Sequence, residues 1–121
     1  MGRLACTAVL QERMRQAYRE VVEAARDPGQ RVAWCSSVGP VELLRTLGFQ
    51  VFIPENHAAM LGASRMATDL IPEATALGYS PDVCSYLTSD IGAFCRGVTA
   101  LSRVDPSFRE VPRPDVLVYE T

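Results

Sequence analysis

Residues 31–53 show the pattern of a strand, a helix and a second strand in close succession. Residues 31–35 are a short apolar run typical of a buried strand, and residues 49–53 form a second one that Pro54 ends. Between them, Pro40 suits the first position of a helix that Gly48 closes. Strands joined by a helix are usually parallel neighbours, so this order predicts a parallel sheet with helices packed on it.

The rest of the chain extends this α/β pattern. Helices are expected at residues 4–26, 56–77 and 81–102, and a last strand at residues 115–119. Pro72 should break or kink the second of these helices, because it lacks an N–H. We therefore expect residues 1–121 to form a single lobe of a doubly wound parallel sheet with flanking helices. Its third strand ends where a site loop should begin, which indicates an incomplete lobe and a truncated chain.

Composition excludes several classes of function. The 12 basic and 14 acidic residues give a formal net charge of −2, and no basic stripe indicates nucleic-acid binding. No apolar run approaches the ~20 residues that span a bilayer, and the start of the chain becomes charged too soon for a signal peptide. We expect a cytoplasmic protein that binds neither membranes nor nucleic acid. In that compartment its four cysteines would be free thiols, metal ligands or redox groups.

Two cysteines lie at the ends of predicted elements. Cys35 ends the first strand and enters a turn before a helix, and Cys84 lies in the first turn of the helix opened by Ser80 and Pro81. A helix amino terminus lowers the pKa of a thiol, so both positions suit a metal ligand. Position alone favours a small packed side chain for Cys35 and leaves the two readings equal for Cys84.

The other two cysteines are assigned to packing. Cys95 follows Cys84 by eleven residues, which displaces it by ~16 Å along a continuous helix, too far for the two to share a small cluster. Cys6 has no polar motif around it. No C-x-x-C spacing indicates a zinc ribbon or a ferredoxin site.

Three further side chains lie near the predicted strand ends. Glu55 is either an acid/base carboxylate near the Cys35 turn or a solvated residue at a helix start. His57, the one histidine, is expected at the surface or as a helix cap. Trp34 should point to the opposite face of its strand from Cys35 and pack under a helix.

Two stretches together resemble the 2-hydroxyacyl-CoA dehydratase family, which includes the benzoyl-CoA reductase subunits. The first is VAWCSSVGPVELL at residues 32–44, continuing through residues 47–56. The second is GYSPDVCSY at residues 78–86, followed by Asp90 and Gly92. They resemble the first and second cysteine motifs at the N-terminal part of such a subunit.

The resemblance implies a function and a site. Family subunits bind a [4Fe–4S] cluster through three cysteines, and Cys35 and Cys84 match the first two, so a further cysteine must come from outside this chain. Ser37 and Glu55 match polar groups near the substrate. The implied partners are an acyl-CoA substrate, a homologous partner subunit and an ATP-hydrolysing activator protein. The implied reaction is radical dehydration or reduction of a CoA thioester, as a lyase or an oxidoreductase.

Two other functions fit the same sequence. The chain could be a non-catalytic remnant that serves as a scaffold domain of a larger complex. It could also be a small thiol redox protein that uses Cys35, for which an unusually low thiol pKa would be required.

Overall fold

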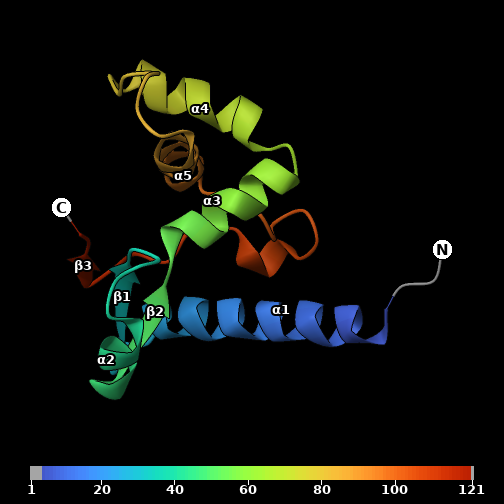
Figure 1. Ribbon diagram of the computed structural model, residues 1–121, viewed down its shortest axis with the longest axis vertical. Helices are drawn as coiled ribbons and strands as arrows, with labels where there is room; N and C mark the ends of the chain where they lie inside the picture. The colour runs from blue at the N-terminus through green and yellow to red at the C-terminus, as the bar shows by residue number, and fades with distance from the viewer. Residues whose placement is uncertain (1–3, 121) are drawn as a thin grey trace.

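The structure is a computed structural model that describes residues 4–120 as a parallel sheet with helices packed around it (Figure 1). The helices are α1 (Ala5–Arg26), α2 (Val41–Thr46), α3 (Pro54–Ala63), α4 (Ala67–Ala76) and α5 (Ser85–Arg96), with a short 3-10 helix at Pro106–Phe108. The strands are β1 (Arg31–Cys35), β2 (Phe49–Phe52) and β3 (Val116–Val118). None of the described helices is both long and apolar enough to cross a membrane.

The sheet is entirely parallel, with the strand order β2-β1-β3. The central strand β1 places Ala33 beside Val51 of β2 and beside Val116 of β3. The predicted fold class is therefore confirmed as a three-stranded, open, helix-flanked sheet of the kind found in an incomplete α/β lobe. The carboxyl ends of the three strands meet at one edge of this sheet, where sites of such folds are built.

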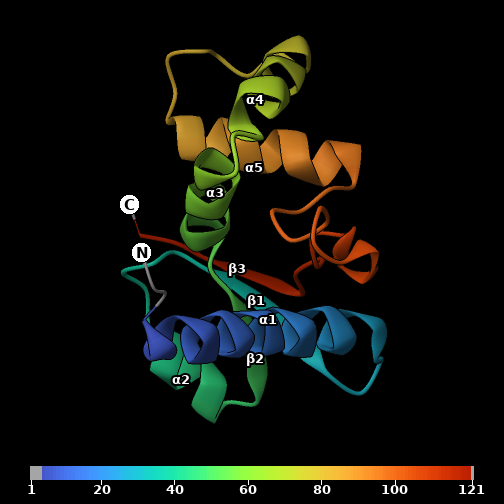
Figure 2. The same ribbon diagram turned by 90° about the vertical axis from the view of Figure 1, so that its right-hand side faces the viewer.

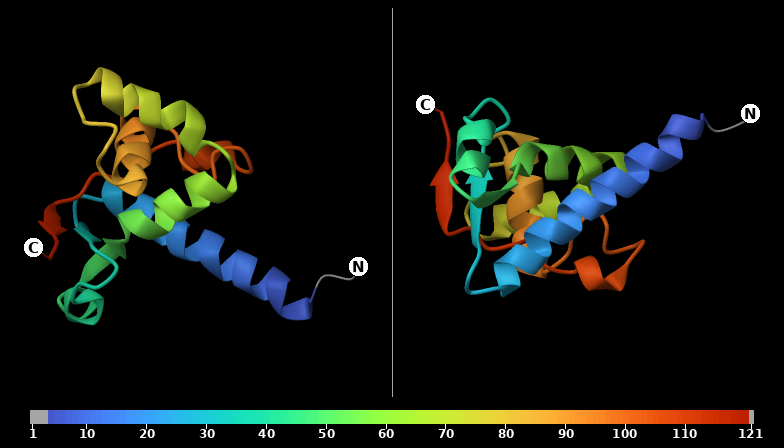
Figure 3. Two further views of the ribbon diagram at one scale, coloured as in Figure 1. Left: turned by 45° about the horizontal axis from the view of Figure 1, so that its top comes forward. Right: turned by 90° about the horizontal axis from the view of Figure 1, so that it is seen from below.

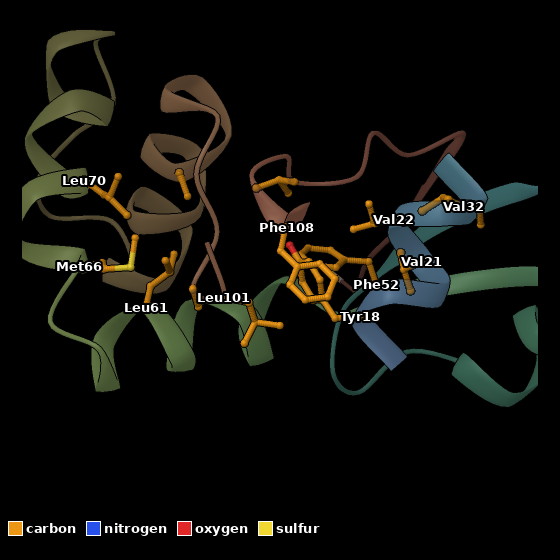
Figure 4. Packing of buried hydrophobic residues seen from close by; sticks show 14 residues of the cluster. Tyr18, Val21, Val22, Val32, Phe52, Leu61, Met66, Leu70, Leu101 and Phe108 are labelled. Atoms are coloured by element: carbon orange, nitrogen blue, oxygen red, sulfur yellow. The ribbon is translucent and has the colours of Figure 1, made fainter. Parts of the chain in front are cut away.

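Alternation along β1 separates two apolar clusters. Val32 belongs to the main core with Tyr18 and Val22 of α1, and Trp34 packs against this core, as expected. Ala33 and Cys35 point to the other face, into a smaller cluster under α2. Figure 4 shows the main core running from α1 and the sheet to α3 and α4.

The helical stretch predicted over residues 56–77 is two helices. α3 starts at Pro54 and ends before Arg65, which adopts a left-handed conformation with φ of 58°. The N–H of Met66 then bonds to the carbonyl of Leu61 at 2.9 Å and closes the turn. The break therefore lies at Arg65, and Pro72 lies within α4.

The helix predicted over residues 81–102 is also shorter. Cys84 is the residue that precedes the first turn of α5, and Gly97, with φ of 65°, ends the helix. Figure 2 shows α3, α4 and α5 grouped together, apart from α1 and α2. Figure 3 shows the first turns of α1 projecting beyond this body, which agrees with the exposure of Leu4, Val9 and Leu10.

Candidate functional site

A pocket of about 800 Å³ lies between the carboxyl edge of the sheet and the α4–α5 pair. Its sheet side includes Cys35 and Ser36 after β1 and Glu55 at the start of α3. Its helical side includes Cys84 and Asp90. The pocket therefore brings together both predicted cluster cysteines and one of the two predicted catalytic residues.

Cys35 is fully buried, with 0% of its surface exposed. The following turn folds back over its sulfur, so that a Cβ added at Gly39 would lie 2.5 Å from Sγ. Burial raises the pKa of the Cys35 thiol, and the carboxylates of Glu55 and Glu120 raise it further. The expected lowering of this pKa by a helix terminus is wrong, because burial and the negative charges of nearby carboxylates raise the pKa instead.

The other cysteines are exposed thiols, and none of the four forms a disulfide. Cys84 lines the pocket directly before α5. Cys95, farther along α5, lines the same pocket. The assignment of Cys95 and Cys6 to packing is wrong, since both are exposed: Cys6 lies at the projecting end of α1 and Cys95 on the pocket side of α5.

Ser37 and Glu55 are in contact through the backbone of the serine. The Ser37 N–H donates to Glu55 Oε1 at 3.3 Å, which orients the carboxylate at the start of α3. Glu55 Oε2 is buried and has no hydrogen-bond partner among the described residues, and the same holds for Ser36 Oγ. The side chain of Ser37 is exposed, and Ser36 rather than Ser37 lines the pocket.

A buried histidine–aspartate pair lies behind the pocket. His57 is 1% exposed, so the expectation of a surface or capping residue is wrong. Its Nε2 accepts the Ala100 N–H at 3.2 Å, which leaves the proton on Nδ1. That nitrogen donates to Asp90 Oδ1 at 2.6 Å. The partners are separated by 33 residues in sequence, and no local pattern connects them.

Asp90 is the more exposed member of the pair and lines the pocket. Only 7% of its surface is exposed. Burial raises the pKa of its carboxyl group, although the hydrogen bond from His57 opposes this effect. Its second oxygen, Oδ2, is buried without a partner among the described residues.

The described residues do not contain a complete metal site. No group of three or more histidine, cysteine, aspartate and glutamate side chains in residues 4–120 is arranged to hold a metal ion. The thiols of Cys35 and Cys84 are donors of the type that iron–sulfur clusters use. Two cysteines are fewer than such a cluster needs, so this part of the chain offers at most part of a ligand set.

Fold and pocket define a class of protein: an α/β lobe with thiols and carboxylates at the carboxyl edge of a parallel sheet. No protein-family model matches the chain. Curated relatives do match. Over 101 residues, 78% of this chain, it is 35% identical to the alpha subunit of lactoyl-CoA dehydratase from Anaerotignum propionicum. Over 105 residues, 87% of this chain, it is 32% identical to the alpha subunit of (R)-2-hydroxyglutaryl-CoA dehydratase from Acidaminococcus fermentans.

A benzoyl-CoA reductase polypeptide of Thauera aromatica is also similar, with 27% identity over 111 residues, 91% of this chain. The chain belongs to the family of 2-hydroxyacyl-CoA dehydratase and benzoyl-CoA reductase subunits. It spans about a quarter of the length of these relatives, namely 24%, 22% and 24%.

Proposed function

We propose that this lobe is part of a dehydratase-like subunit that acts on a CoA thioester, and that Cys35 and Cys84 supply two thiolates to a [4Fe–4S] cluster. The observation that carries the proposal is the shared pocket: both cysteines are among its lining residues, Cys35 at the end of β1 and Cys84 directly before α5. At least one further cysteine would come from outside the described residues. When bound, the cluster would supply one electron at low potential to the thioester.

Glu55 would hold and move the proton in this pocket. Its Oε1 is fixed by the Ser37 N–H, while Oε2 is free of partners among the described residues on a side chain that lines the pocket. A carboxylate with one anchored and one free oxygen suits general acid/base work on a bound substrate. Ser37 would act through its backbone, as the group that positions Glu55.

The partners follow from the same proposal. The relatives are subunits by name, and a homologous partner subunit would complete the assembly. An ATP-hydrolysing activator protein would deliver the electron, and the substrate would be an acyl-CoA in the cytoplasm. Use of Cys35 as a redox thiol is disfavoured, because burial and nearby carboxylates raise its pKa, whereas reactive thiols have a lowered one.

The test is the iron content of cysteine variants. The chain is fused to the part of the lactoyl-CoA dehydratase alpha subunit that follows the matched region, and the fusion protein is purified without oxygen. Cys35→Ser and Cys84→Ser should lose the iron and its visible absorption, since a serine hydroxyl is a poor substitute for a thiolate. Cys6→Ser and Cys95→Ser should keep both, and Glu55→Gln should keep the cluster but slow turnover.

Iron retained by Cys35→Ser and lost by Cys95→Ser would show that the cluster site is assigned to the wrong thiols. A completed subunit that folds and binds no iron in any preparation would favour a scaffold function.

A further inference from the structure

Two carboxylate oxygens at the pocket have no hydrogen-bond donor. They are Glu55 Oε2 and Asp90 Oδ2, both buried and without a partner among the described residues. Both residues line the pocket. In folded proteins most buried acceptors are satisfied, so an unsatisfied one calls for a partner.

Asp90 is held in place from behind. His57 donates to Oδ1, and the histidine ring is itself fixed by the Ala100 N–H. Tyr18 and Phe52 pack against the ring, with centroid distances of 6.1 and 5.5 Å. Asp90 cannot rotate to find another donor without giving up its bond to His57. The second oxygen therefore stays without a donor among the described residues, on a side chain that lines the pocket.

The wall around Asp90 is apolar. Leu87, Ile91 and Phe94 of α5 line the pocket at helical spacing on the same side of the helix. Leu117 and Val118 of β3 also line the pocket. A ligand that fills this space would present apolar surface along this wall and a donor where it meets Asp90.

We propose that Asp90, positioned by His57, is a ligand-binding acceptor that takes an N–H or O–H group of a largely apolar ligand in this pocket. The inference rests on the proposed function in taking this pocket as the ligand site. It adds a requirement on the ligand: a hydrogen-bond donor, such as an amide N–H or a hydroxyl, flanked by apolar groups. It does not require a cluster to be present.

Two small ligands of the same shape separate the effect of a hydrogen-bond donor from the effect of apolar contact. One is the primary amide of phenylbutyric acid, and the other is the methyl ketone in which CH₃ replaces NH₂. Both keep the ring and the carbonyl, and only the amide can donate. Trp34 is the single tryptophan of the chain and lines the pocket, so its fluorescence reports binding of either probe to the 121-residue chain.

We expect the unmodified chain to bind the amide about tenfold more tightly than the ketone, the range of a hydrogen bond to a buried carboxylate. Asp90→Asn should abolish or reverse this preference, because the free position then becomes a donor. Asp82→Asn is the matched control: Asp82 is exposed, lies in the loop before Cys84 and does not line the pocket. It should keep the preference.

The role of His57 is tested by comparing a variant that can still donate a hydrogen bond to Asp90 with one that cannot. His57→Asn keeps a donor near Nδ1 and should retain the amide preference, whereas His57→Leu should lose it. If His57→Leu keeps the preference as fully as His57→Asn does, His57 does not position Asp90.

Equal binding of the two probes to the unmodified chain, an unchanged preference in Asp90→Asn, or no binding of either probe would each overturn the inference. These results are separate from the iron content of the cysteine variants, so the two proposals can fail independently.

Discussion

Gly92→Ala is the substitution whose effect follows most directly from the packing of two helices. A Cβ at Gly92 of α5 would lie 2.1 Å from the carbonyl oxygen of Leu70 in α4 and 2.7 Å from its carbonyl carbon. Cβ atoms essentially never come within 3.0 Å of a non-bonded heavy atom. Because backbone atoms cannot rotate away, α4 and α5 must move apart by about 1 Å at this point.

The expected change in the free energy of unfolding of Gly92→Ala is the difference between two effects. Overpacking of a tight contact costs about 1–3 kcal/mol, and this contact involves the backbone of the buried Leu70. Alanine is favoured over glycine inside a helix by about 1 kcal/mol. The clash is at the severe end of the range, so we expect a net loss of about 2 kcal/mol in the free energy of unfolding.

Urea denaturation followed by circular dichroism measures this loss. With a typical slope, about 2 kcal/mol lowers the urea midpoint by about 1 M. Gly62→Ala is the matched control, because Gly62 lies inside α3 and a Cβ there has nothing within 4 Å. It should raise stability by up to about 1 kcal/mol. A Gly92→Ala variant as stable as the unmodified chain would refute the close approach of α4 and α5.

Two further predictions concern the pocket. Gly39→Ala should destabilise the chain by about 1–3 kcal/mol, because the new Cβ would lie 2.5 Å from Cys35 Sγ. The same clash should increase the rate at which a thiol reagent labels Cys35. Unchanged stability and an unreactive Cys35 would contradict the turn geometry. Asp90 has a raised pKa in the folded state, so its contribution to stability is fully present below its ordinary value of 3.8 and declines as the pH rises through the raised pKa. Asp90→Asn cannot ionise, so the stability of the unmodified chain relative to this variant should fall over that window in urea titrations, and a pH-independent difference would speak against a raised pKa.

The elements around β1 could be predicted from sequence because their signals are local. Residues 31–35 and 49–53 are apolar runs bounded by turn residues, and Gly48, with φ of 86°, closes the helix between them. The strand order could not be predicted, because β3 joins β1 from the far end of the chain. The end of α3 escaped prediction for a related reason: Arg65 adopts a left-handed conformation that its residue type does not signal.

The candidate site, too, could be predicted from sequence only in part. Cys35 and Cys84 were recognisable as pocket residues, because a strand end and a helix start each have a known place in an α/β fold. The burial of His57 depends on Tyr18, Phe52 and Asp90. These partners meet only in the folded chain, so nothing near the histidine in sequence distinguishes it from a surface residue.

The two cysteines that line the pocket belong to different parts of the fold. Cys35 belongs to the central strand of the sheet, and Cys84 belongs to the loop between α4 and α5, outside the sheet. Any group bonded to both sulfurs would therefore act as a cross-link between the sheet and the helical pair. Its binding energy would add to the free energy of unfolding, since an unfolded chain does not hold the two thiols together. In such a protein, loss of the bound group and loosening of the α4–α5 pair would be one event.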